Sequence, residues 1–294
     1  MTERFFDQIV LGHNAFFGVD HLDTRRGQER EAYFAKTENI VQVIQWAVDA
    51  GAGGLMMSTH ERSKGVAQAL LQNPALSDRL RLYPLLPYVQ KYVIAANEKG
   101  MINVVMDSMS GTSTGEKMRM MWNGAKGVLG KDILAILSNM ISIELKPYKG
   151  LNIPCVFLHD VFTDLALALD MRDIVDFYYE EMQKQFGCKA AFATKNLPLL
   201  LQKFAEWGHP QPLVMPHFNK VGFSMNPSRE VCEVALEQFR PHVMAMSCLA
   251  SGYLKPDEAF AYLGGLKTIE SVVVGMSSQS HVLSTTAAVK KYFN

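Results

Sequence analysis

Cys188-Lys-Ala-Ala-Phe-Ala-Thr-Lys-Asn196 is a short, mostly apolar run that stops at two polar residues. The next residues, Leu197-Pro-Leu-Leu-Leu201, open a segment with the apolar spacing of a helix, which we expect to end at Trp207. An apolar run of this length is typical of a parallel strand that is buried on both faces. We therefore predict a strand at Lys189–Thr194, a following helix, and polar side chains where the strand ends.

The same strand-and-helix unit recurs along the whole chain. Eight further apolar runs are predicted to be strands: Ile9–His13, Gly54–Thr59, Leu80–Tyr88, Ile102–Asp107, Pro154–His159, Pro212–His217, Val243–Ser247 and Ser271–Gly275. Helical patterns lie between them: Glu38–Ala50, Asp164–Phe186, Leu197–Trp207 and Ser228–Phe239. Strands that alternate with helices indicate a parallel sheet, and 294 residues suit one closed (β/α)₈ TIM barrel. We expect residues 1–294 to form this single domain.

Nine candidate strands are one more than the barrel holds. Ile102–Asp107 and Pro154–His159 compete for the fourth position. Residues 108–150 between them are irregular, with a Ser/Thr/Gly-rich loop before a helical pattern. We interpret 108–150 as an inserted helical pair that forms a lid over the barrel mouth or an oligomer surface, and an ordinary crossover helix is the alternative.

Composition excludes several classes of partner. Lys plus Arg and Asp plus Glu both number 29, so no basic surface for nucleic acid or an anionic membrane is expected. No apolar run approaches the roughly 20 residues of a membrane span. The cysteines show no metal-binding or disulfide spacing: Cys155, Cys188, Cys232 and Cys248. We expect a cytoplasmic protein that binds a small-molecule substrate, and an anionic substrate is one option. A homo-oligomer is a further option for its partners.

Polar residues at the strand ends point to a shared site, because ligands of TIM barrels bind where the carboxyl ends of the strands converge. Half of the eight histidines lie at such ends. The residues that end the predicted strands are His13, Asn14, Ser58, Thr59, His60, Glu61, Tyr88, Asp107, His159, Asp160, Lys195, Asn196, His217, Ser247, Ser277 and Ser278. We predict that their side chains gather around one cavity.

Several segments resemble the aldo/keto reductases. They are Ala47–Gly51, Val156–His159, the run Cys188–Asn196, Val243–Leu254 and Val272–Ser278, within residues 40–61 and 154–290. The resemblance implies a TIM barrel that acts on a small carbonyl or hydroxyl substrate with NAD(P). It places His159 on the catalytic histidine that polarises the carbonyl, and Asn196 on the asparagine that binds the nicotinamide carboxamide. It also implies cofactor contacts at Ser247, Leu249, Gly275, Ser277 and Ser278.

The chain departs from the family at most of the catalytic tetrad. Ser58 replaces an aspartate, Glu61-Arg62-Ser63 occupy the loop of the tyrosine acid, and Pro87-Tyr88 replace the lysine. A serine also stands where the family carries an arginine for the 2′-phosphate. Carbonyl reduction needs a proton donor, and Tyr88 is one candidate for a relocated acid. The resemblance therefore implies a divergent oxidoreductase.

Three alternatives remain open from the residues. A metal-dependent lyase, isomerase or hydrolase would bind zinc, iron or manganese through side chains at the strand ends. Its candidate ligands are His13, His60, Glu61, His159, Asp160 and His217. A Schiff-base, aldolase-type enzyme would use Lys195, activated by burial, with Asp107 or Glu61 as proton carrier. A catalytically silent relative would only bind a phosphorylated ligand. We interpret His209, His242 and His281 as structural.

Overall fold

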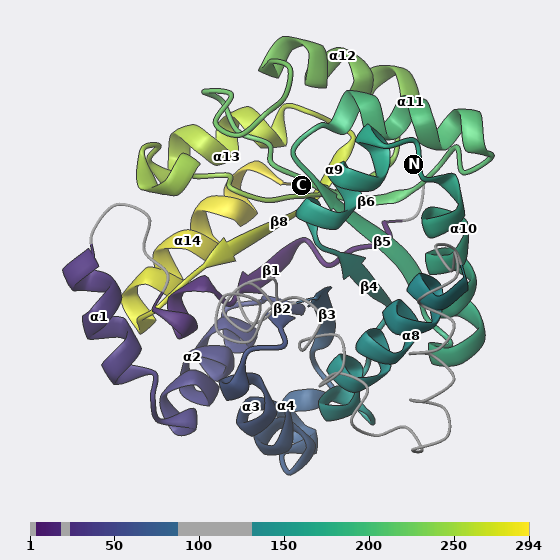
Figure 1. The fold of residues 1–294 in the computed structure, drawn as a ribbon. Helices are drawn as coiled ribbons and strands as arrows, with labels where there is room; N and C mark the ends of the chain where they lie inside the picture. The colour runs from purple at the N-terminus through teal and green to yellow at the C-terminus, as the bar shows by residue number, and fades with distance from the viewer. Residues whose placement is uncertain (1–3, 19–23, 88–130, 294) are drawn as a thin grey trace, which may run out of the picture.

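The computed structural model describes residues 4–18, 24–87 and 131–293. Its strands form one closed parallel barrel in sequential order, from β1 next to β2 through to β8 next to β1 (Figure 1). The strands are β1 (Ile9–Gly12), β2 (Gly54–Ser58), β3 (Arg81–Leu86), β4 (Cys155–Leu158), β5 (Lys189–Thr194), β6 (Leu213–Pro216), β7 (His242–Ala245) and β8 (Ile269–Gly275). The predicted fold class is thus confirmed.

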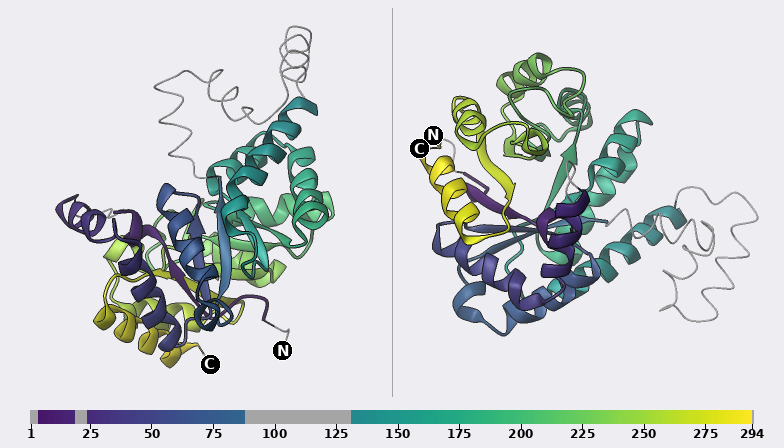
Figure 2. Two further views of the ribbon diagram at one scale, coloured as in Figure 1. Left: turned by 90° about the horizontal axis from the view of Figure 1, so that it is seen from below. Right: turned by 90° about the vertical axis from the view of Figure 1, so that its left-hand side faces the viewer.

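Helices surround the barrel in the views of Figures 1 and 2. In the first half of the chain they are η1 (Asn14–Phe17), α1 (Thr24–Tyr33), α2 (Thr37–Asp49), α3 (Glu61–Leu71), α4 (Pro74–Ser77), α8 (Lys131–Leu145) and η2 (Lys146–Tyr148). In the second half they are α9 (Asp160–Ala168), α10 (Arg172–Glu181), η3 (Met182–Phe186), α11 (Leu197–Trp207), α12 (Arg229–Phe239), η4 (Ala250–Gly252), α13 (Pro256–Gly264) and α14 (Gln279–Tyr292). None of these described helices is long and apolar enough to cross a membrane.

The fourth strand of the barrel is β4, which corresponds to the predicted run Pro154–His159. Its competitor, Ile102–Asp107, lies outside the described residues. Within the predicted insertion, α8 contacts β3 and α10, so it occupies the crossover between the third and fourth strands. Residues 108–130 also lie outside the described part, and the lid or oligomer surface stays a prediction.

The prediction of one helix over Asp164–Phe186 is wrong. The chain forms α9 and α10 there, with a break after Leu169. Asp170 at the break has φ of 54°, in the left-handed region that helices do not contain. The amide of Met171 then donates to the Ala166 carbonyl at 2.8 Å and closes the turn. The apolar period continues through the break, which is why the sequence pattern missed it.

The amino end of the barrel is filled by side chains. Phe6, just before β1, stacks on Phe157 with ring centroids 5.8 Å apart and also contacts Tyr83. The carboxylate of Asp7 accepts from the Arg81 guanidinium and from the Tyr83 hydroxyl, each at 2.8 Å. This packing closes one end, so the open space of the barrel lies at the carboxyl ends of the strands.

Candidate active site

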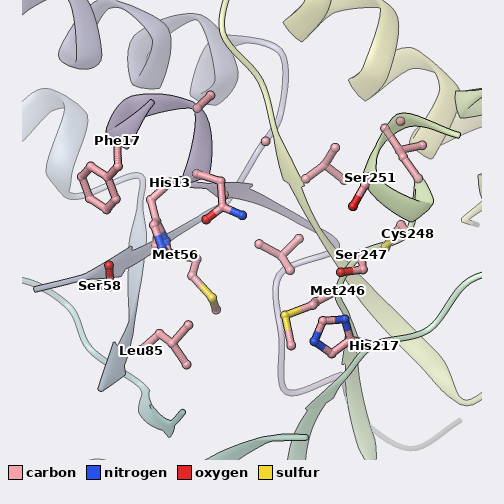
Figure 3. Close-up of a pocket in the computed structure, with 18 of the residues that line it drawn as sticks. His13, Phe17, Met56, Ser58, Leu85, His217, Met246, Ser247, Cys248 and Ser251 are labelled. Atoms are coloured by element: carbon pink, nitrogen blue, oxygen red, sulfur yellow. The ribbon is translucent and has the colours of Figure 1, made fainter. Parts of the chain in front are cut away.

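A cavity of about 650 Å³ opens at the carboxyl ends of the strands. Every strand or the loop behind it contributes to the wall, as expected where parallel strands converge. The lining residues at or just after the ends of β1 to β8 include, in order, His13, Ser58, Leu85, His159, Lys195, His217, Ser247 and Gly275. Figure 3 shows His13, Met56 and Leu85 on one side of the cavity, with His217, Met246 and Ser247 on the other.

The cavity brings together much of the predicted site. Predicted residues in its wall are His13, Asn14, Ser58, His159, Asp160, Lys195, His217, Ser247, Leu249, Gly275 and Ser277. Five other predicted residues, Thr59, His60, Glu61, Asn196 and Ser278, are described but do not line it. Tyr88 and Asp107 lie outside the described residues, so their proposed roles in proton transfer stay predictions.

Asp160 is the centre of the polar side of the cavity. Its Oδ1 lies 2.6 Å from His159 Nδ1, and its Oδ2 lies 3.2 Å from Lys195 Nζ and 3.7 Å from His217 Nε2. The side chains come from the ends of β4, β5 and β6, so one carboxylate joins three neighbouring strand ends. Burial alone would raise the pKa of Asp160, but its interactions with His159, His217 and Lys195 hold that pKa well below its usual range. Asp160 is therefore an ionised acceptor at neutral pH.

His13 lies across the cavity from His217 (Figure 3) and is only 9% exposed. Its Nδ1 lies 3.3 Å from the Met56 carbonyl oxygen, and its ring is 5.0 Å from the Phe17 ring. Burial lowers the pKa of His13 to about 4, because the charged imidazolium loses its hydration. His13 is thus neutral at physiological pH and offers a hydrogen bond but no charge.

The predicted metal ligands do not converge on one point. His60 caps the amino end of α3, where its Nδ1 accepts from the Arg62 amide at 3.2 Å, and its ring stacks on Phe17. Glu61 is exposed in the first turn of the same helix. Among the described residues, no group of three or more His, Cys, Asp or Glu side chains could hold a metal ion. The metal-dependent alternative therefore gains no support.

The burial expected for Lys195 is wrong. Its side chain is 45% exposed and its ammonium group pairs with Asp160, because the strand ends one residue earlier and the lysine lies at the cavity mouth. A nucleophilic lysine of the Schiff-base type needs an apolar environment that favours the neutral amine. The structure supplies a carboxylate instead, so Lys195 is placed to interact with an anion.

The loops after β7 and β8 form the remaining wall. Ser247 and Ser251 line the cavity, and both have left-handed backbones with φ of 56° and 57°, an uncommon conformation for residues other than glycine. Such conformations are held only where surrounding contacts enforce them, and they cluster at ligand sites. In the loop after β8, Ser277 lies just before α14, whose N-cap Ser278 accepts from the His281 amide at 3.3 Å.

Asn196 has a clear structural role. Its Oδ1 accepts from the Leu199 amide at 3.3 Å and caps the amino end of α11, which begins Leu197-Pro198. Asparagine is among the preferred N-cap residues because its side-chain oxygen satisfies a free amide of the first turn. The contact with a nicotinamide carboxamide, which the family resemblance implied, stays a prediction.

The cavity wall also contains residues that were missed from the sequence, and two of them, His281 and Arg30, are basic. His281, which we expected to be structural, lines the cavity from the first turn of α14. Burial and the nearby charge of Arg30 lower the pKa of His281. The serines that cap α14 could have pointed to His281, three residues after the cap. Arg30 lies on α1, and no local pattern predicts which way a connecting helix faces the barrel mouth.

Comparison with known proteins identifies relatives in fold only. No protein-family model and no curated protein sequence matches the chain. A structure assigned to the aldo-keto reductases from Pseudomonas aeruginosa superposes with a TM-score of 0.61 at 13% identity, over 97% of this chain and 90% of that one. The glycerol dehydrogenase of Gluconobacter oxydans gives 0.52 at 12% identity, over 97% and 86%.

An aldo-keto reductase of Brucella melitensis gives a TM-score of 0.51 at 11% identity, over 87% of this chain and 89% of that chain. Alignments of this length span the complete barrel rather than one unit of it. At such low identity they carry the architecture and no residue roles. The chain therefore has the closed (β/α)₈ barrel fold of the aldo-keto reductases.

Proposed function

We propose that this protein is a nicotinamide-dependent oxidoreductase that interconverts a small carbonyl compound and its alcohol. One observation carries the proposal: a single cavity joins the His159–Asp160 pair to the wall formed by the loops after β7 and β8. An imidazole next to a carboxylate can hold and exchange a proton with a substrate oxygen. The opposite wall ends at a helix amino terminus, which favours phosphate groups.

The residues present fit such a cofactor. Ser58 Oγ and His217 Nδ1 are buried in the cavity wall and have no hydrogen-bond partner among the described residues, so a bound molecule could satisfy them. Ser247 and Leu249 would contact the nicotinamide end, while Gly275, Ser277 and the amino end of α14 would hold the phosphates. When bound, the cofactor supplies or accepts a hydride at the substrate carbon.

The charge of the lining also fits an anionic ligand. Among the lining residues that the structure describes, Arg30 and Lys195 are the cations and Asp160 is the only carboxylate. Arg30, next to His281 at the α14 side, would face the cofactor phosphates and compensate for the serine that replaces the family's arginine. Lys195 is placed on the His159 side, where it would bind an anionic group of the substrate.

The apolar part of the wall would hold the carbon skeleton of a substrate. Met56, Leu85 and Met246 face the cavity near His13 and His217 (Figure 3). These side chains exclude water from the reacting carbon, which protects a hydride-transfer step from competing solvent. The space favours a small aldehyde, ketone or alcohol. A silent ligand-binding protein would share the cavity but not turn over such compounds.

The test uses a pair of charge insertions, one just before α14 and one within it. Ser277→Asp puts a carboxylate in the cavity wall, whereas Ser284→Asp puts one on the exposed surface of α14, outside the cavity lining. We expect Ser277→Asp to weaken NADPH and NADH binding at least tenfold, measured by titration calorimetry, because like charges repel at close range. Ser284→Asp should leave the affinity within about twofold of wild type, because salt screens a more distant surface charge.

Wild-type protein should also oxidise NADPH or NADH in the presence of at least one member of a panel of small aldehydes and ketones. Failure of both cofactors to bind wild-type protein would contradict the proposal. Binding that Ser277→Asp and Ser284→Asp weaken equally would also contradict it, since the cofactor would then lie elsewhere. Binding with no turnover across the panel would favour the silent relative.

A further inference from the structure

We propose that Asp160 is a positioning residue that makes His159 the proton donor and acceptor of this site. The inference rests on the proposed function and deepens it. In the aldo/keto reductase resemblance a tyrosine supplies the proton, but Glu61-Arg62-Ser63 occupy that loop here. The described cavity wall contains no tyrosine, whereas it contains a histidine in direct contact with a buried carboxylate.

The distance between the two side chains fixes the position of one proton. His159 Nδ1 and Asp160 Oδ1 are 2.6 Å apart. An ionised carboxylate has only acceptor sites, so we infer that Nδ1 carries the hydrogen and donates it to Asp160. The Val161 amide lies 3.0 Å from the same Oδ1 and 3.3 Å from Nδ1, and with Nδ1 protonated it donates to the carboxylate. Nε2 of His159 is then the nitrogen available to a substrate.

The backbone holds this arrangement in place. The His159 amide donates to the Leu86 carbonyl at 2.7 Å, which extends the β3–β4 ladder up to the histidine. Asp160 is the first residue of α9 and is 7% exposed. The Phe162 and Thr163 amides both donate to the His159 carbonyl at 3.0 Å, so the turn between strand and helix is tied from both sides. The pair therefore sits on rigid elements rather than on a loose loop.

The other imidazoles of the cavity are less suited to the role. His217 Nε2 is 3.7 Å from Asp160 Oδ2, beyond hydrogen-bond range. His13 faces the cavity from β1 but is buried and neutral at physiological pH. The remaining groups around the pair are Lys195 on Oδ2 and Asp164 one turn further along α9. Asp164 is engaged by Thr194 and by the Lys195 amide, so it does not compete for His159.

The hydride and every proton of the proposed reaction are accounted for. In reduction, NADPH or NADH would supply the hydride that bonds to the carbonyl carbon, and the π-electron pair of the C=O bond would move to oxygen. That oxygen takes the proton from Nε2 of the His159 imidazolium. The neutral imidazole keeps its Nδ1 proton on Asp160 and regains the Nε2 proton from solvent. In the alcohol-to-carbonyl direction, Nε2 would accept the hydroxyl proton while the carbon gives its hydride to NADP⁺ or NAD⁺.

The first test reads the tautomer of His159 by ¹⁵N NMR of histidine-labelled protein, without cofactor, at a pH where the ring is neutral. We expect the proton on Nδ1 in wild type. In Asp160→Ala it should move predominantly to Nε2, because the acceptor that held it is gone. Asp160→Asn, which keeps an acceptor oxygen without the charge, should fall between them. Asp164→Ala is the matched control on the same helix and should resemble wild type.

The second test is the pH profile of kcat/KM for carbonyl reduction. Asp160→Ala should lower kcat about 100-fold, within the range of general acid catalysis, with the Kd for NADPH unchanged. Its alkaline limb should differ from that of wild type, because the carboxylate that contacts His159 is gone. Loss of structure alone would lower activity at every pH without moving the limb. His217→Gln should keep the limb of wild type.

Several results would overturn the inference. The first is a proton on Nε2 of His159 in the neutral wild-type ring. The second is an Asp160→Ala pH profile whose alkaline limb coincides with that of wild type. The third is loss of the alkaline limb in His217→Gln instead. Retention of the limb in Asp160→Ala together with its loss in Tyr88→Phe would assign the donor to Tyr88. If NADPH and NADH do not bind while His159 keeps its Nδ1 proton, the proposed function fails and Asp160 is only structural.

Discussion

Histidines at the strand ends of this barrel differ through their immediate surroundings. His13 is buried against Phe17 and the Met56 carbonyl, His60 caps a helix, and His159 contacts a carboxylate. The residue type and its place after an apolar run are the same in each case. Burial, backbone hydrogen bonding and a neighbouring carboxylate therefore give each of these rings a different environment.

The burial of His13 predicts a pH dependence of stability. Its pKa falls from 6.5 to about 4 on folding, so the unfolded chain binds a proton that the folded chain refuses between these values. Stability is therefore complete above pH 6.5 and is lost as the pH falls toward 4, by roughly 3 kcal/mol in total from this residue. His13→Asn, which cannot titrate, should show a correspondingly smaller loss of unfolding free energy between pH 7 and pH 4 in urea denaturation.

The baseline stability of His13→Asn does not enter this comparison, because each protein is compared with itself at two pH values. Equal losses in wild type and His13→Asn would show that His13 titrates normally in the folded protein. That result would also contradict the lowered pKa that we assign to His13.

At the level of elements, strands were easier to predict than helix breaks. β5 and α11 match their predicted bounds, and Ser228, the first residue of the predicted helical pattern Ser228–Phe239, caps α12. These boundaries have local causes, namely capping side chains and the end of an apolar run. The break between α9 and α10 has no such signal, because Asp170 adopts its left-handed backbone within a continuing apolar pattern.

Capping of α11 by Asn196 predicts a separable stability effect. Asn196→Ala should lower the free energy of unfolding by about 1 kcal/mol, because the Leu199 amide loses its acceptor. Asn196→Ser should recover most of that loss, since a serine hydroxyl also caps well. Urea denaturation of the three proteins checks this order. Equal stability of wild type and Asn196→Ala would show that the cap contributes nothing.

At the scale of the whole molecule, convergence of the strands could be predicted but the outer wall of the cavity could not. His13, His159 and His217 meet because a closed parallel barrel brings every carboxyl strand end to one face. Arg30 and His281 reach the same cavity from α1 and α14. Their positions depend on how those helices pack against the barrel, which no short stretch of sequence specifies. The sequence pattern therefore identified the site residues at the strand ends and missed those that the surrounding helices contribute.

The placement of NADPH or NADH beside His159 is tested most directly by isotope transfer. Cofactor deuterated at the transferred position of the nicotinamide ring is incubated with wild-type protein and the carbonyl panel, and mass spectrometry locates the label. We predict that the wild-type protein produces an alcohol with deuterium on the former carbonyl carbon. His159→Gln should form this labelled alcohol at least 100-fold more slowly, a loss typical of a missing general acid. The distant variant Ser284→Asp should form it at the wild-type rate. The absence of labelled alcohol with both cofactors, or equal rates for wild type and His159→Gln, would contradict the placement of the cofactor beside His159.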